Sequence, residues 1–235
     1  MTRSADPVTV NPAPTMNVPV LTLSTLLFAL PALQAEEGFT FVEVANPGNV
    51  KINTVRKNPT GNVRFKDVPF KLPPSRLGME TDGPRLEGPI SVGFTTIVHL
   101  PTAIYILLTG RDVKPKFKGK PVGEVVLTFT DAKINEKTLT YPITAGETVR
   151  EWWADKSETP LQDSTGNPKR VNVYTEPQTR NGKPIAAFMD MYVIELDPTQ
   201  VPGDLTGIEI KDTSRETVGD TSPSLIIAGI TVKHE

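Results

Sequence analysis

Prolines interrupt this chain so often that few segments are long enough for a helix. The 235 residues include 23 prolines and 17 glycines. Proline lacks the amide proton that a helix interior needs and fixes its own φ angle, so it ends regular segments. No stretch repeats apolar residues at helical spacing; apolar and polar residues instead alternate in short blocks. The sequence therefore predicts an all-β protein.

Two neighbouring blocks show the clearest alternation. In the segments 123–130 (GEVVLTFT) and 138–143 (TLTYPI), every second residue is apolar, and these residues share one face of a strand. The polar segment 131–137 joins the two blocks. We therefore expect a hairpin with a rather long loop, packed by one face on a core.

Two longer blocks are apolar on both faces. Residues 91–98 lead through a short turn into 103–108 (AIYILL), and residues 185–196 (IAAFMDMYVIEL) have the same character. Apolar residues on both faces are typical of central strands that are covered on both sides. These blocks are therefore the predicted centre of the core.

Shorter alternating segments complete the pattern. They lie at residues 39–44, 63–70, 171–175, 205–210 and 225–232. Runs of Asn, Asp, Gly and Pro separate the blocks, as turns require. About nine or ten strands at this spacing predict a single antiparallel β-sandwich or jelly roll over residues 37–235.

The first 36 residues are expected to lie outside this domain. Residues 18–30 (VPVLTLSTLLFAL) form an apolar run of the length of a signal-peptide core, and the small residue Ala35 precedes Glu36 and Glu37. Residues 1–36 are interpreted as a signal peptide or a disordered N-terminal segment, the alternatives for the run being a buried strand or a membrane anchor. We therefore predict a secreted or periplasmic bacterial protein, which meets a membrane only through an uncleaved N-terminal segment.

Charge and residue usage exclude several classes of function. The 25 Lys and Arg residues stand against 27 Asp and Glu, and nucleic-acid-binding proteins carry a basic excess, so no nucleic-acid partner is expected. The absence of cysteine excludes disulfides, thiolate catalysis and thiolate zinc sites. The two histidines, His99 and His234, lack the spacing of a zinc site; we expect His99 in the core or at a strand end and His234 to be frayed.

The sequence contains no catalytic motif of the nucleophile-elbow, phosphate-loop or dinucleotide-binding type. Asp190 and Glu195 lie on one predicted strand, but their odd separation points them to opposite faces, so they cannot flank one glycosidic bond. Asp190 is expected to be a hydrogen-bonded sheet aspartate or to lie at an edge position. We therefore predict a protein that is not an enzyme and has no cofactor.

A structural calcium ion stays open as an alternative. The segment Asp212-Thr213-Ser214, with Asp220, offers oxygen ligands, and so does Asp82-Gly83. The density of such ligands is below that of a dedicated calcium loop.

The best functional lead is the pair Trp152-Trp153, the only tryptophans in the chain. Adjacent residues on a strand face opposite ways, so one indole is expected in the core and the other at the surface. An exposed indole can stack on the apolar face of a sugar ring. The predicted ligand-binding residues are Trp152, Trp153, Tyr174, Arg180 and Asn181, with Arg150 as a further hydrogen-bond donor. The alternative is that both indoles cover an edge of the sandwich.

Five segments carry a resemblance to a known family: 68–70 (VPF), 106–110 (ILLTG), 123–131 (GEVVLTFTD), 145–153 (AGETVREWW) and 225–232 (LIIAGITV). In this order they resemble the galactose-binding-like (discoidin-like) jelly-roll domains appended to secreted bacterial hydrolases. The resemblance covers about residues 62–235. It implies a jelly roll that binds glycans or mediates contacts, that holds a structural calcium ion in some members, and that is rarely catalytic.

Three functions are therefore considered. The leading hypothesis is a secreted, non-catalytic β-sandwich that binds carbohydrate. The second is a structural or assembly module that contacts another secreted or envelope protein. The third, less favoured, is a polysaccharide-acting enzyme.

Overall fold

The structure is a computed structural model. It describes residues 35–44, 50–51, 61–72, 77–81, 91–151, 153–155, 164–219 and 223–235. The predicted signal-peptide core at residues 18–30 lies outside the described residues, so that prediction stays untested. Residues Leu33–Glu235 form one compact unit. In the described part of the chain, the regular structure is nearly all β-strand, as predicted from the prolines and the alternation.

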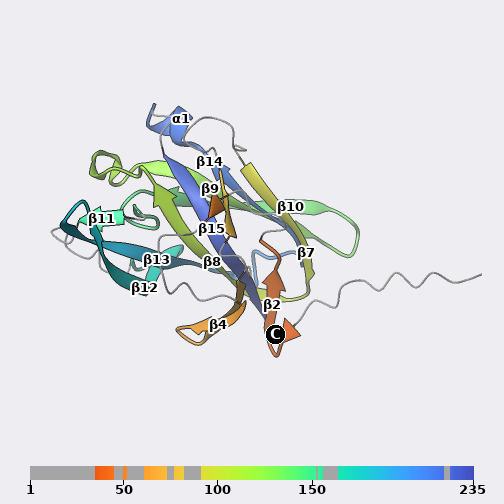
Figure 1. The fold of residues 1–235 in the computed structure, drawn as a ribbon. Helices are drawn as coiled ribbons and strands as arrows, with labels where there is room; N and C mark the ends of the chain where they lie inside the picture. The colour runs from red at the N-terminus through yellow and green to blue at the C-terminus, as the bar shows by residue number, and fades with distance from the viewer. Residues whose placement is uncertain are drawn as a thin grey trace, which may run out of the picture. The chain divides into compact units, whose positions relative to one another are not determined.

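The main sheet is built on five strands. In spatial order they are β12 (Lys169–Arg180), β13 (Lys183–Glu195), β8 (Pro101–Arg111), β15 (Ser224–His234) and β2 (Phe39–Val42). All of these pairings are antiparallel. Four short strands also pair within this sheet: β1 (Ala35–Glu36), β3 (Val50–Lys51), β6 (Leu77–Glu80) and β11 (Trp153–Asp155). Figure 1 shows β8 and β15 running side by side.

The second sheet has four strands. Their order is β10 (Glu136–Thr144), β9 (Pro121–Thr130), β14 (Asp204–Asp212) and β7 (Ser91–Val98). The two sheets pack as a sandwich, with no closed barrel, so the predicted β-sandwich is confirmed. The helices of the described residues are the short α1 (Ser214–Thr217) and the 3-10 turn η1 (Pro115–Phe117).

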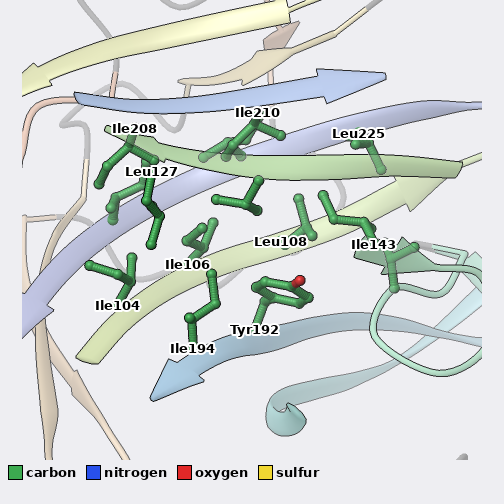
Figure 2. Close-up of a cluster of buried hydrophobic side chains, with 14 of the residues drawn as sticks. Ile104, Ile106, Leu108, Leu127, Ile143, Tyr192, Ile194, Ile208, Ile210 and Leu225 are labelled. Carbon is green, nitrogen blue, oxygen red and sulfur yellow. The ribbon is translucent and has the colours of Figure 1, made fainter. Parts of the chain in front are cut away.

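The core between the sheets follows from the alternation. Ile104, Ile106 and Leu108 of β8 are at most 1% exposed and face the apolar row of β9, which includes Leu127. Figure 2 shows these side chains meeting Ile208 and others between the two sheets. Full burial of one such side chain stabilises the fold by about 1.5–3 kcal/mol. The predicted one-faced hairpin at 123–143 is thereby confirmed as β9 and β10.

The outer face of the main sheet is covered as well. A hairpin of β4 (Gly61–Phe65) and β5 (Val68–Leu72) packs Phe70 on this face, in one cluster with Leu107 and Met189. Both faces of β8 and β13 are therefore buried, which confirms the prediction for the segments 103–108 and 185–196.

Two of the predicted strands were wrong in detail. The segment 63–70 is not one strand but two, because the chain reverses at Lys66 and Asp67, whose φ angles are 51° and 67°. Two adjacent residues with positive φ form a tight hairpin turn. Glycine or asparagine usually occupies such positions, and neither is present here, so the turn could not be predicted. The block 91–98 is not covered on both sides: as β7 it is the edge of the second sheet, and Ile97 is 67% exposed.

The strand predicted at 171–175 is longer in the structure and extends to Arg180. It includes Pro177, a residue that argues against a central strand. In the described part of the chain, β12 pairs with β13 alone, and an edge strand tolerates proline on its unpaired side. The turn to β13 is made by Asn181 and Gly182 with φ angles of 50° and 76°, as a tight hairpin requires.

Candidate functional site

The candidate site lies where β8 and β13 separate. Their pairing runs from Ala103–Glu195 to Leu108–Asp190 and then stops. Beyond this point β8 continues along β15 to Arg111, and the first half of β13 no longer pairs with β8. β12 pairs with the other edge of β13, from Lys183 to Val193. The two strands β8 and β13 therefore separate at Asp190. We call this separation the fork.

The tryptophan-bearing segment fills the fork. On one side, the amide of Gly110 in β8 donates to the carbonyl of Arg150 at 2.9 Å. On the other side, β11 pairs with β13, with Trp153 opposite Ala187. The described residues 150–151 and 153–155 therefore lie between β8 and β13, and we call them the wedge.

Glycine is required where the wedge meets β8. A Cβ at Gly110 would lie 2.3 Å from Cγ2 of Val113 and 3.2 Å from the carbonyl oxygen of Arg150. The amide of Val113 donates to Oε2 of Glu151 at 2.8 Å, which fixes the wedge a second time. Both contacts act on the residues directly before the tryptophan pair, so the backbone there is held in place.

A buried polar cluster anchors the wedge from inside. Asp190, which is 2% exposed, accepts hydrogen bonds at Oδ1 from Nη2 of Arg150 (2.6 Å) and from Nδ2 of Asn172 (2.9 Å). Nε of Arg170 lies 3.8 Å from Oδ2, and the guanidinium of Arg150 stands 3.7 Å from the ring centroid of Phe188. Buried charges are costly unless paired, so this cluster fixes the position of Arg150.

The cluster decides two predictions. Asp190 is the hydrogen-bonded sheet aspartate that was expected, and Glu195 is exposed on the opposite face of β13. Arg150 was expected to reach a ligand, but its side chain is only 9% exposed and forms an ion pair with Asp190. Sequence reasoning missed this role because the two residues are distant in the chain and meet only through the fork.

The predicted ligand residues are arranged along β13. Tyr174 of β12 lies opposite Met189, and Glu176 lies opposite Ala187, as does Trp153 from the other edge. Opposed residues share a face, so positions 153, 174 and 176 lie on the outer face of the main sheet. Trp152 lies outside the described residues, and of Trp153 the structure describes the backbone position.

The remaining predicted residues lie farther along. Arg180, described here by its backbone, pairs with Lys183, and Asn181 is exposed in the following turn. From Met189 to Lys183 the strand extends by about 20 Å at 3.3 Å per residue. The structure therefore brings positions 153 and 174 together, and places Arg180 and Asn181 at the far end of the same hairpin.

Tyr174 is half-buried against the outer-face cluster. Its hydroxyl donates to Oε2 of Glu176 at 3.5 Å. Burial, and then the negative charge of Glu176, raise the pKa of the Tyr174 phenol above its usual value. Tyr174 is therefore a neutral, partly exposed hydrogen-bonding group.

The histidines lie away from the fork. His99 is exposed in the turn between β7 and β8, with Nδ1 2.8 Å from Oδ1 of Asp204, as expected for a strand-end residue. His234 is not frayed, because its amide donates to the carbonyl of Gly38 and extends β15.

Among the described residues, no group of three or more His, Asp and Glu side chains gathers as a metal site. Asp212 already accepts from the hydroxyls of Thr81 (3.1 Å) and Ser214 (2.5 Å), so its oxygens are engaged within the protein. The other oxygen ligands considered for calcium, at Asp82 and Asp220, lie outside the described residues. No described helix is long and apolar enough to cross a bilayer.

Comparison of the chain with protein-family models, with curated proteins and with solved structures finds no match.

Proposed function

We propose that this protein is a secreted or periplasmic, non-catalytic β-sandwich of the galactose-binding-like kind that binds carbohydrate beside the fork. The observation that carries the proposal is the wedge itself. The only two tryptophans of the chain follow directly on Arg150 and Glu151. The carbonyl of Arg150 accepts from Gly110 of β8, and the carboxylate of Glu151 accepts from Val113, just after β8. Because these contacts hold the backbone at Arg150 and Glu151, the segment that leads to the tryptophans needs less ordering on binding, and preorganisation favours affinity.

The chemistry around position 153 supports a sugar ligand. Aromatic rings stack on the apolar faces of sugar rings, while acidic and phenolic side chains accept and donate hydrogen bonds to hydroxyls. Tyr174 and Glu176 lie on the same face of the sheet as position 153, on the neighbouring edge of β13. Arg180 and Asn181 extend this row and would meet a longer oligosaccharide.

A glycan array with the full chain tests the proposal. We expect binding that Trp153→Ala or Trp152→Ala weakens at least tenfold, and that Trp153→Phe largely retains, because phenylalanine keeps an aromatic face. Tyr141→Phe, a change on β10 of the second sheet, is the control. Unfolding midpoints establish that each variant is folded. A folded wild-type chain that binds no glycan on the array contradicts the proposal.

The second candidate, an assembly module, would use the open edge of β12. Two features oppose the addition of a further strand there: the register shift between Asn172 and Tyr174, and Pro177. Natural edge strands carry bulges and prolines as protection against such pairing. Light scattering distinguishes the candidates, since an assembly module that pairs with itself through β12 forms a stable dimer without any glycan.

A further inference from the structure

A single asparagine–glycine step occurs in the chain, at Asn181-Gly182. It forms the turn between β12 and β13, where Arg180 pairs with Lys183 across two turn residues. The φ angles of 50° and 76° require residues that tolerate the left-handed region, and asparagine followed by glycine is a usual choice. The turn therefore explains why both residues are present, but the same pair is also chemically reactive.

Both residues of this turn are open to solvent. Asn181 and Gly182 are exposed, and so are Lys183 and Pro184 after them. A Cβ built on Gly182 would meet no atom within 4 Å, so no neighbouring group crowds this glycine. Among the described residues, none forms a hydrogen bond with the side-chain amide of Asn181. Water and base therefore reach the amide of Asn181 and the backbone nitrogen of Gly182.

We propose that Asn181 deamidates in the folded protein, and that it does so before the other asparagines that the structure describes. Base removes the amide proton of Gly182, and the nitrogen forms a bond to Cγ of Asn181. The bond from Cγ to Nδ2 breaks, and the side-chain nitrogen takes up a proton and leaves as ammonia. Water then opens the five-membered succinimide ring at either carbonyl, which yields aspartate or isoaspartate at position 181. No oxidant or reductant takes part.

Glycine is the residue that favours this ring closure. The following amide nitrogen must approach Cγ of the asparagine, and a Cβ on the following residue would crowd that approach. The other described asparagines all precede residues other than glycine; they are Asn62, Asn135, Asn167 and Asn172. Three of these are also held by side-chain hydrogen bonds: Asn135 to Asp131, Asn167 to Glu195 and Asn172 to Asp190.

The folded turn slows the reaction without preventing it. Ring closure requires the peptide between Asn181 and Gly182 to rotate out of its left-handed arrangement, so the end of the hairpin must open. Because the turn residues are exposed, this opening breaks few buried contacts and costs much less than global unfolding. Conversion of Asn181 therefore does not require the sandwich to unfold.

The reaction changes the surface at the end of the β12–β13 hairpin. Aspartate replaces an amide, which donates and accepts hydrogen bonds, by a carboxylate that only accepts, and it adds a negative charge beside Lys183. Isoaspartate also adds a methylene group to the main chain, which a two-residue turn cannot hold without a change of its geometry. This inference goes beyond the proposed function and does not depend on it, since the turn reacts whether or not a glycan binds.

The experiment incubates the full chain at pH 6 and at pH 9, folded in buffer and unfolded in guanidinium chloride. Peptide mass spectrometry follows each asparagine, with chromatographic separation of the isoaspartyl peptide. In the folded chain we expect Asn181 to convert at least tenfold faster than Asn62, an exposed asparagine that precedes valine and serves as the internal control. Conversion should be faster at pH 9 than at pH 6, because base starts the reaction.

Two variants complete the experiment. Asn181→Gln is expected to stop the conversion, since glutamine would have to close a six-membered ring, and Asn181→Asp marks the position of the aspartate product in the chromatogram. Equal rates at Asn181 and Asn62 in the folded wild type overturn the inference. An Asn181 that stays intact in the folded chain but converts in the unfolded chain also overturns it, because the turn then blocks ring closure. If Asn181 converts and no glycan binds, this inference stands while the proposed function fails.

Discussion

Arg150 and Asp190 form a buried ion pair, with Nη2 of the arginine 2.6 Å from Oδ1 of the aspartate. Their side chains are 9% and 3% exposed. The pair joins the wedge to β13 at the point where β13 leaves β8. It therefore holds the tryptophan-bearing segment in the sheet.

Removal of one charge of this pair is expected to destabilise the fold strongly. In Asp190→Asn, Arg150 keeps a buried charge without its carboxylate, which costs about 3–5 kcal/mol in comparable pairs. Urea unfolding at pH 7 measures the effect. The double variant Arg150→Met, Asp190→Asn is expected to lose less than the sum of the two single changes. A loss below about 1 kcal/mol in the single variant would contradict a structural role for the pair.

Tyr192 is expected to make stability dependent on alkaline pH. The side chain is fully buried, its hydroxyl donates to the carbonyl of Pro142 at 2.8 Å, and burial raises the pKa of the phenol far above 10. Above about pH 10 the unfolded chain loses this proton and the folded chain keeps it. The contribution of Tyr192 is therefore complete below pH 10 and is lost as the pH rises.

The variant Tyr192→Phe separates the contribution of the hydrogen bond to Pro142 from the contribution of the raised pKa. At pH 7 it is expected to lose about 1 kcal/mol, because the carbonyl of Pro142 loses its donor. Between pH 10 and 11 its free energy of unfolding should decline less steeply than that of the wild type, by up to about 1.4 kcal/mol per pH unit. Tyr105 and Tyr141, whose pKa values are also raised by burial, keep their own contribution in both proteins. Identical slopes would disprove the assignment to Tyr192.

Gly203 is expected to tolerate no side chain. A Cβ there would lie 2.3 Å from the carbonyl oxygen of Thr130 and 2.8 Å from Cα of Asp131, both backbone atoms that cannot move aside. Gly203→Ala should therefore destabilise the second sheet by about 2 kcal/mol or more, as overpacking does. Gly93→Ala on β7 is the matched control, because a Cβ there meets no atom within 4 Å. Thermal unfolding of both variants gives the comparison, and equal midpoints would refute the predicted clash.

Asp131 is expected to contribute stability that is lost in acid. Its carboxylate accepts from the amides of Lys133 and Asn135 and from the side chain of Asn135. The hydrogen bond from the Asn135 side chain, followed by those from the backbone, lowers the pKa of Asp131. A lowered pKa means that the contribution is present above about pH 4 and disappears as the pH falls through the folded value. Asp131→Asn should therefore flatten the rise in stability between pH 2 and 5, as followed by urea unfolding. An unchanged pH profile would show that the turn does not use this charge.

The β9–β10 hairpin was predictable because its partners are neighbours in the sequence. The alternate residues Val125, Leu127 and Phe129 indicate the buried face, and the two strands can pair without a contact to a distant segment. The hairpin of β4 and β5 was missed, since the turn at Lys66 and Asp67 lacks the glycine that usually supplies a positive φ.

The site was predictable only in part. An aspartate within an apolar strand must find a partner, so the bonded state of Asp190 followed from its sequence context alone. Which residue bonds it did not follow, because Arg150 and Asn172 reach Asp190 from two other segments of the chain. The role of Arg150 as an anchor, in place of a ligand contact, could be read only from the fork.

The sequence by itself determined that the chain is all-β, that β8 and β13 are buried on both faces, and that its two tryptophans are adjacent residues. Prolines and the alternation of side chains act within a few residues, so their effects can be predicted without knowledge of the tertiary structure. The tertiary structure alone decided that β8 and β13 part at Asp190 and that residues 150–151 and 153–155 lie between them. Pairing between strands that are far apart in the sequence depends on the apolar surface that the whole sheets bury, and a local sequence pattern does not contain this information.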